Sequence, residues 1–213
     1  MTRHDMAITR FPKMNDAAEK YLQKVWGCVL IGGRSSRMGR AKQLLTDAAG
    51  KTWLERIVSA LLTRVPDVVL VGAGEVPAAL QDLRVIGDAE GAAGPLAGLA
   101  AVMRYKADVS WLLTACDMPL VSAEAMDWLL MQRAPEVTAV VPYNPDTLRH
   151  EPLFSWYDGQ CAPYVETLLK SAEQRITRLI DCPGAVSPPI PSHLLSAWRN
   201  INTPEQLEQS NIW

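Results

Sequence analysis

Short apolar runs alternate along the chain with longer segments whose apolar residues recur at helical spacing. The first run, WGCVLIGG from Trp26, predicts a buried strand that ends at a pair of glycines. Further on, Thr52 precedes WLERIVSALLTRV, whose apolar positions form one face of a helix that Thr52 can cap. The same criteria predict strands over 67–72, 83–88, 111–117, 137–143, 152–157 and 197–202, and helices over 94–106, 123–133 (capped by Ser122) and 160–181. Residues 184–193 are Pro-rich and predicted to be irregular, and Thr203 to Gln206 have the spacing of a capping box.

This alternation predicts an α/β fold, with a mostly parallel sheet covered by helices on both faces. In such sheets ligands bind beyond the carboxyl ends of the strands. The residues to search for chemistry are therefore those that follow Ile31, Val71, Ile86, Ala115 and Val141.

Length and composition narrow the class of protein. We expect residues 1–24 to be a polar N-terminal extension and residues 25–213 to be a single domain. The net charge of −2 gives no electrostatic footprint for nucleic acid, so an anionic substrate requires a local cationic site. No apolar run is long enough to span a bilayer, and the first residues lack the apolar centre of a secretory signal. We therefore expect a cytoplasmic protein without nucleic-acid or membrane partners.

The cysteines and histidines do not indicate a metal site. Cys28, Cys116, Cys161 and Cys182 include no CxxC pair, and two of them lie in apolar, strand-like segments. We expect reduced, mostly buried thiols. The three histidines form no ligand cluster with these cysteines, so zinc is not expected.

The loop after the first strand carries the chemistry of a phosphate site. It contains three glycines, whose small size exposes backbone N–H donors, and four cationic side chains within nine residues: Arg34, Arg37, Arg40 and Lys42. It is not a P-loop, because five residues separate Gly33 from Gly39 and no Lys-[ST] pair follows. A triphosphate fits this combination of donors, although a solvated basic turn has the same composition.

Two acidic residues follow predicted strands. Asp117 comes directly after WLLTAC, at the expected carboxyl edge of the sheet, where a carboxylate suits a magnesium ion (Mg2+) that bridges a triphosphate. The alternative is an Asp that only begins a turn. Asp88, after LRVIG, is open to the same two interpretations.

Two further segments are candidates on the acceptor side. Gly94 opens a small-residue helix, GPLAG, whose start exposes N–H groups to an anion or allows close packing on the sheet. Asn200 and Asn202 alternate onto one face of the last predicted strand, so both amides are expected to reach one cavity. His150 is either an acceptor-side donor or a structural residue.

These motifs together resemble the signature of the molybdenum cofactor nucleotidyltransferases. The segment LIGGRSSRMG, followed by Lys42 and Leu44-Leu45, matches the pattern L-A-G-G-x-S-x-R-M-G-x-x-K-x-L except for Ile31 in place of Ala. The resemblance extends to C-D-x-P at Asp117, to G-P-L-A-G from Gly94 and to N-x-N-T-P-E from Asn200, and covers about residues 25–209. It implies a Rossmann-like nucleotidyltransferase with GTP as donor and molybdopterin, or its molybdenum form, as acceptor.

The resemblance also implies roles for individual residues. The catalytic residues would be Arg37, Lys42 and Asp117, with Asp117 holding Mg2+. The nucleotide would contact Leu30, Ile31, Gly32, Gly33, Lys42, Asp88 and Asp117. The acceptor would contact Gly94, Asn200 and Asn202. Transient contact with molybdenum-insertion proteins or target molybdoenzymes is a further expectation.

The choice of base and of acceptor leaves alternatives open. Gly32-Gly33 resembles the guanylyl branch, whereas the cytidylyl branch more often carries Ala-Ala-Gly at this point. The segment from Lys42 to Leu45 fits either branch, and Gly72 stands where some guanylyl members have Asn nearby. The alternatives are a CTP-dependent molybdopterin cytidylyltransferase, a sugar-phosphate nucleotidyltransferase of the same fold, and a nucleotide-binding protein without catalysis.

Overall fold

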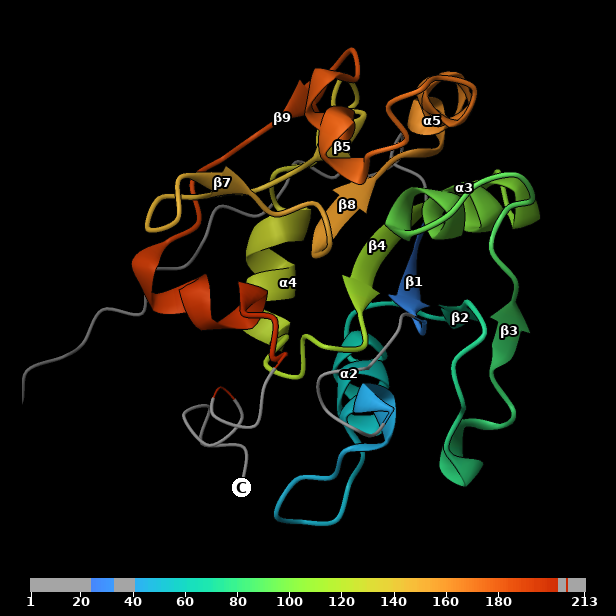
Figure 1. Ribbon diagram of the computed structural model, residues 1–213. Helices are drawn as coiled ribbons and strands as arrows, with labels where there is room; N and C mark the ends of the chain where they lie inside the picture. Colours follow the sequence, from blue (N-terminus) through green and yellow to red (C-terminus); the bar gives the residue numbers. More distant parts are fainter. Residues whose placement is uncertain (1–23, 33–40, 203–205, 207–213) are drawn as a thin grey trace, which may run out of the picture.

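The computed structural model describes residues 24–32, 41–202 and 206, and is built on a seven-stranded sheet (Figure 1). The strand order is β3-β2-β1-β4-β8-β5-β9. The strands of this sheet are β1 (Lys24–Leu30), β2 (Val68–Val71), β3 (Arg84–Ile86), β4 (Val109–Ala115), β5 (Ala139–Val140), β8 (Ser155–Tyr157) and β9 (Ala185–Val186). A separate hairpin pairs β6 (Tyr143–Asn144) with β7 (Arg149–His150).

The sheet is mostly parallel, as the sequence predicts. The strands β3, β2, β1 and β4 run in one direction, so their carboxyl ends meet at one edge. The strand β8 is antiparallel to both β4 and β5, and β5 pairs in parallel with β9. The α/β class is therefore confirmed, with a reversed strand in the middle of the sheet.

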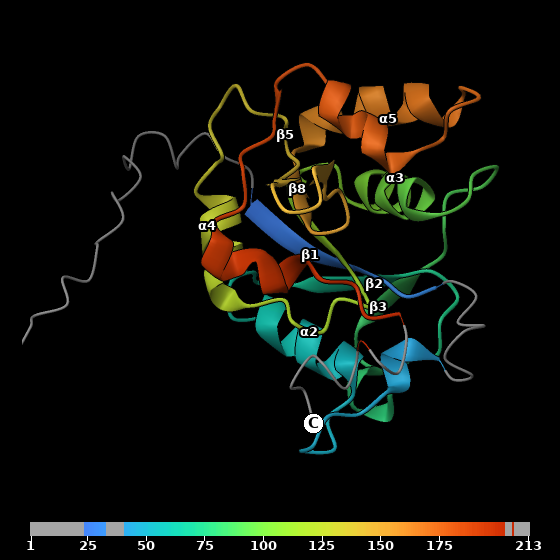
Figure 2. The same ribbon diagram turned by 60° about the vertical axis from the view of Figure 1, so that its left-hand side comes forward.

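Helices cover both faces of the sheet and make three layers (Figure 2). The helices α2 (Trp53–Leu61) and α4 (Ala123–Leu130) lie on one face, and α3 (Pro95–Tyr105) and α5 (Ala162–Leu169) on the other. Alternate side chains of β2 enter the two cores: Val68 and Leu70 join the α2 side, and Val69 and Val71 join the α3 side. Because each face of β2 packs against an apolar core, every residue of the strand is apolar.

Capping residues begin the helices where the sequence predicts. The Thr52 hydroxyl accepts from the Glu55 N–H, and the Glu55 carboxylate accepts from the Thr52 N–H, which completes a capping box at α2. The Ser122 hydroxyl accepts from Ala125 N–H at α4. At α3, Gly94 has φ +75°, a conformation that favours glycine, and Pro95 occupies the first helical position. The remaining helical turns are the 3-10 segments η1 (Lys42–Leu44), η2 (Ala78–Leu80), η3 (Gly159–Cys161), η4 (Ile176–Asp181) and η5 (Ser192–Trp198).

Some predicted elements are wrong in extent or type. The helix predicted over 160–181 is divided into η3, α5 and η4, because Ser171 and Gln174 side chains donate to the Leu168 and Leu169 carbonyls and end α5. The strand predicted over 137–143 is divided between β5 and the first residue of β6, Tyr143, because Pro142 between them lacks an N–H for the ladder. The predicted strand 197–202 does not form: its beginning belongs to η5, and residues 199–202 have no regular structure.

The structure also bears on the predictions for the cysteines, for membrane-spanning helices and for the N-terminal extension. The four cysteines are free and buried, as predicted. No helix in the described part of the chain is both long and apolar enough to cross a membrane. The predicted extension lies outside the described residues apart from Lys24, which begins β1, so the boundary at residue 24 stays a prediction.

A buried hydrogen bond across the β4–β8 junction gives a test of the fold. Trp156 Nε1 donates to Ser110 Oγ at 2.9 Å, and both residues are fully buried. We expect Ser110→Ala to lower the free energy of unfolding by about 1–3 kcal/mol, because the buried indole N–H loses its partner. Urea unfolding measures this change. The exposed Ser59→Ala is the control, and an equal effect of both substitutions would contradict the prediction.

Candidate active site

Three segments that are far apart in the sequence meet at Lys42. The Lys42 ammonium donates to Asp117 Oδ2 at 3.2 Å and to Asn202 Oδ1, residues 75 and 160 positions further along the chain. The Lys42 and Asp117 side chains are 16% and 19% exposed, so solvent screens this pair less than a surface ion pair. The structure thus brings together a predicted phosphate-binding cation, the predicted metal ligand and a predicted acceptor residue.

The sheet positions Asp117. The Cys116 N–H donates to the Leu30 carbonyl at 3.0 Å, which continues the parallel pairing of β1 and β4 past the end of both strands. The next residue, Asp117, therefore leaves the sheet at its carboxyl edge. This is where ligands bind in parallel α/β sheets.

The C-terminal segment is held over the same edge. The Ile201 N–H donates to the Asp117 carbonyl at 2.8 Å. The Ile201 side chain is buried against Trp53, with Leu45 and Leu120 packed beside them. Because Ile201 is anchored to this cluster, Asn202 beside it is placed within reach of Lys42.

One oxygen of Asp117 has the environment of a cation ligand. Asp117 Oδ1 is buried and has no hydrogen-bond partner among the described residues, whereas Oδ2 faces Lys42. Such an atom is costly unless a ligand satisfies it. The described residues contain no cluster of three or more His, Cys, Asp or Glu side chains that could hold a metal ion. A magnesium ion at Asp117 therefore needs most of its oxygens from substrate and water, which is how this ion commonly binds nucleotides.

The neighbouring Cys116 is a free, buried thiol. Burial, and secondly the charge of Asp117, raises the pKa of the Cys116 thiol to about 11. The sulfur therefore stays protonated at neutral pH. The site supports direct transfer between substrates more readily than a covalent cysteine intermediate.

A cavity of about 500 Å³ lies beside Lys42 at the ends of β1, β2 and β3. It is lined by Gly32, Ala41, Gln43, Ala73, Gly74, Glu75 and Asp88. Gly74 allows the close approach of two loops here, because a β-carbon at this position would lie 2.7 Å from the Ile31 carbonyl oxygen. The predicted nucleotide residues Gly32 and Asp88 are thus both in the wall of one cavity.

Leu30 and Ile31 contribute to this region in a different way. The Ile31 side chain is fully buried in the α2-side core, and its backbone N–H donates to the Val71 carbonyl. Its extra bulk relative to alanine therefore faces the core. A β-carbon on Gly98 would lie 2.5 Å from Leu30 Cδ2 and 3.5 Å from Asp88 Oδ1, so the glycine of GPLAG serves close packing of α3 on the sheet.

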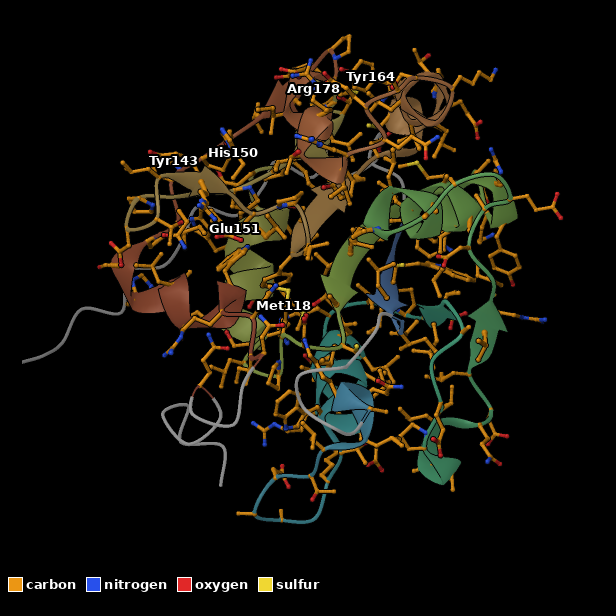
Figure 3. The ribbon with its side chains drawn as sticks, in the orientation of Figure 1. Met118, Tyr143, His150, Glu151, Tyr164 and Arg178 are labelled. Atoms are coloured by element: carbon orange, nitrogen blue, oxygen red, sulfur yellow. The ribbon has the colours of Figure 1, made fainter. Side chains whose placement is uncertain are left out.

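A second, larger groove of about 870 Å³ lies beside the C-terminal segment that carries Asn202. Its lining includes Pro95, Asn144, Arg149, His150, Glu151, Arg199, Asn200 and Gln206. Figure 3 shows Tyr143 and His150 on the β6–β7 hairpin, with Glu151 toward the centre of the molecule. The predicted acceptor residue Asn200 lines this groove, and Gly94 directly precedes Pro95 in its wall.

Residues of the β6–β7 hairpin fix the positions of His150 and Glu151 in the wall of this groove. Ser187 Oγ donates to the Val141 carbonyl and therefore accepts from His150 Nδ1, at 2.7 Å. The His150 ring also contacts Tyr143 edge to face, so part of its role is structural. Burial raises the pKa of Glu151, and the Asn144 amide donates to that carboxyl.

The expectation for the two asparagines is corrected in one respect. The segment is not a strand, and Asn202 contacts Lys42 whereas Asn200 lines the groove. Gln206 links the two positions, because its side-chain oxygen accepts from the Asn202 N–H and it lines the groove beside Asn200. The pair therefore lies at the boundary between the Lys42 site and the groove.

Other predicted site residues lie outside the described part of the chain, and some lining residues were not predicted. Gly33 and Arg37 are among residues 33–40 and stay predictions. Gln43, Glu75 and Arg199 line the two cavities although sequence reasoning did not select them. Their only sequence signal is that each directly follows or precedes a candidate residue or a glycine turn.

The comparisons with known proteins identify the family of the chain. A sequence model of the family described as MobA-like NTP transferase domain matches residues 27–186. A molybdenum cofactor guanylyltransferase of Rhizobium leguminosarum bv. trifolii is 30% identical over 203 residues, which cover 89% of this chain and 93% of that protein. A probable molybdenum cofactor guanylyltransferase of Pelotomaculum thermopropionicum is 27% identical over 191 residues, covering 87% of this chain and 91% of the relative.

A solved structure shares the fold. Molybdopterin-guanine dinucleotide biosynthesis protein A from Archaeoglobus fulgidus has a TM-score of 0.69 and 24% identity, covering 87% of this chain and 96% of that one. The family match contains Lys42, Asp88 and Asp117 and ends before Asn200. The chain therefore belongs to the MobA-like NTP transferase family and is a nucleotidyltransferase.

Proposed function

We propose that the protein transfers GMP from GTP to the terminal phosphate of molybdopterin or its molybdenum form and releases pyrophosphate. The observation that carries the proposal is the contact of Lys42 with Asp117 and Asn202 between two cavities. Ala41 and Gln43, on either side of Lys42, line the first cavity, and Asn200 and Gln206 line the second. A donor nucleotide in the first cavity and an acceptor in the second would meet at Lys42.

The proposed reaction needs no covalent enzyme intermediate. An oxygen of the acceptor phosphate attacks the α-phosphorus of GTP in line with the α–β bridging oxygen, whose bond to that phosphorus breaks. The nucleophile is already an anion at neutral pH, so the protein chiefly positions the two phosphates and neutralises their charge. Lys42 and Arg37 are proposed to bind the triphosphate, with backbone N–H groups of Gly32 and Gly33 toward the nucleotide.

The metal and the remaining residues follow from the same arrangement. Asp117 would hold the magnesium ion through its unpaired oxygen, and the ion would offset charge on the triphosphate. Asp88, Leu30 and Ile31 would form the nucleotide side. Gly94, Asn200 and Asn202 would form the acceptor side, where Arg149 and Arg199 add positive charge.

Three other functions are alternatives to this proposal. A molybdopterin cytidylyltransferase would use CTP, a sugar-phosphate nucleotidyltransferase would use another acceptor, and a carrier would bind nucleotide without releasing pyrophosphate. The names of the curated relatives favour the guanylyl reaction. A cytoplasmic location, and contact with molybdenum-insertion proteins or molybdoenzymes, stay predictions.

The deciding experiment measures pyrophosphate release with each of the four NTPs and purified molybdopterin. We expect release with GTP that depends on molybdopterin and on Mg2+, because both reacting phosphates must be present. CTP-dependent release would favour the cytidylyl alternative. Binding of GTP in calorimetry without pyrophosphate release would favour the carrier.

We expect Asp117→Ala to lower the rate of pyrophosphate release at least about tenfold to a hundredfold, because it removes the proposed metal ligand. The control is Asp108→Ala, which removes a carboxylate that is 77% exposed and paired only with Lys106. Full turnover by Asp117→Ala would refute the metal assignment.

We expect Lys42→Gln to lower kcat for pyrophosphate release about a hundredfold, because a cation beside the reacting phosphates is lost. Steady-state kinetics at saturating GTP measure it. Lys51→Gln is the matched control, since the exposed Lys51 side chain donates to Ser59 and lines neither cavity. A change confined to KM would instead assign Lys42 to ground-state binding.

A further inference from the structure

Gln43 is a buried side chain in the wall of the cavity beside Lys42. It is 6% exposed, and it is the buried residue of η1. Its amide makes no hydrogen bond to another described residue. An amide in a cavity wall can donate to and accept from a ligand that occupies the cavity.

The amide faces the nucleotide-side cavity. Gln43 lines that cavity, and its Nε2 lies 3.0 Å from the point where a β-carbon on Gly74 would stand. The glycine therefore leaves the amide uncovered on the cavity side. Because Gln43 follows Lys42 directly, a ligand whose phosphates bind Lys42 can place its base beside Gln43.

Among the described residues, the cavity wall has few polar side chains, and each has a defined ability to donate or accept hydrogen bonds. Among the described lining residues they are Gln43, Glu75 and Asp88. A carboxylate accepts hydrogen bonds and an amide N–H donates them, so Gln43 is the donor among these three side chains. Asp88 Oδ1 lies toward α3, 3.5 Å from the β-carbon position of Gly98, whereas Glu75 adjoins Gly74 beside Gln43.

This set of donors and acceptors matches one base better than the others. The hydrogen-bonding edge of guanine has two adjacent donors, N1–H and the 2-amino group, next to one acceptor, O6. A carboxylate can accept from both donors while an amide N–H donates to O6. Cytosine instead presents one donor, the 4-amino group, beside two acceptors, N3 and O2. A carboxylate that accepts from two adjacent positions of guanine would therefore meet an acceptor on cytosine.

We propose that Gln43 and Glu75 together read the base of the donor nucleotide, with the Gln43 amide donating to guanine O6 and the Glu75 carboxylate accepting from N1–H and the 2-amino group. This inference rests on the proposed function for the identity of the ligand class. It adds the residues that make the choice between guanine and cytosine. Burial of the amide makes the choice strict, because a base without a matching acceptor leaves the amide unpaired.

The test is calorimetric titration of the full chain with GTP, ITP and CTP in the presence of Mg2+, which needs no acceptor. We expect Gln43→Leu to weaken GTP binding about tenfold or more while CTP binding changes less than about twofold. Gln43→Glu should lower the ratio of GTP to CTP affinity further, because a second carboxylate repels O6 and can accept from the cytosine 4-amino group. Glu75→Gln should remove most of the preference for GTP over ITP, which lacks the 2-amino group.

The exposed Gln160→Leu is the control and should bind all three nucleotides as the unmodified chain does. Melting temperatures identify variants that fail to fold, and Gln43→Glu and Glu75→Gln keep the inference testable if Gln43→Leu is one of them. Equal losses of GTP and CTP affinity in folded Gln43 variants would overturn the inference and assign Gln43 a structural role. If the unmodified chain binds neither nucleotide, the proposed function itself fails; if it prefers GTP and the variants keep that preference, only the role of Gln43 and Glu75 fails.

Discussion

The contact of the Lys42 ammonium with Asp117 and Asn202 is the interaction on which the site depends. It joins the segment after the first loop, the end of β4 and the C-terminal segment, three parts of the chain that meet only in the folded molecule. The partly buried position of the two charged side chains strengthens their attraction, and Asn202 completes the environment of the ammonium group. A triphosphate that binds here would replace contacts that the protein already makes with its own acidic and amide groups.

The sheet topology explains why two cavities lie beside this contact. In the parallel half, β1, β2 and β3 end side by side, and the glycines after β2 let its loop approach the Ile31 carbonyl. This leaves a cavity for one ligand. In the other half, the reversed strand β8 follows the β6–β7 hairpin, whose residues form the wall of the second groove. The change from parallel to antiparallel pairing at β4 therefore coincides with the change from the proposed donor side to the proposed acceptor side.

In the proposed function, two neighbouring residues of η1 contact different parts of the nucleotide. Lys42 is directed toward Asp117 and Asn202, where the reacting phosphates are proposed to lie, and Gln43 is directed into the cavity below Gly74. One short turn can thus couple selection of the base to placement of the phosphates.

The sequence by itself determined the order of most strands and helices, the α/β class and the placement of Asp117 at the carboxyl edge. These follow from local apolar periodicity and capping groups, as at Thr52 and Ser122, which act over a few residues. Only the tertiary structure decided that β8 runs against β4, that η5 replaces a predicted strand, and that Asn202 contacts Lys42 while Asn200 lines the groove. It also decided that Gln43 is buried and faces a cavity, because burial depends on loops that follow other strands. Local patterns carry no information on which distant segments pack together, and for that physical reason the partners of each site residue appear only in the folded chain.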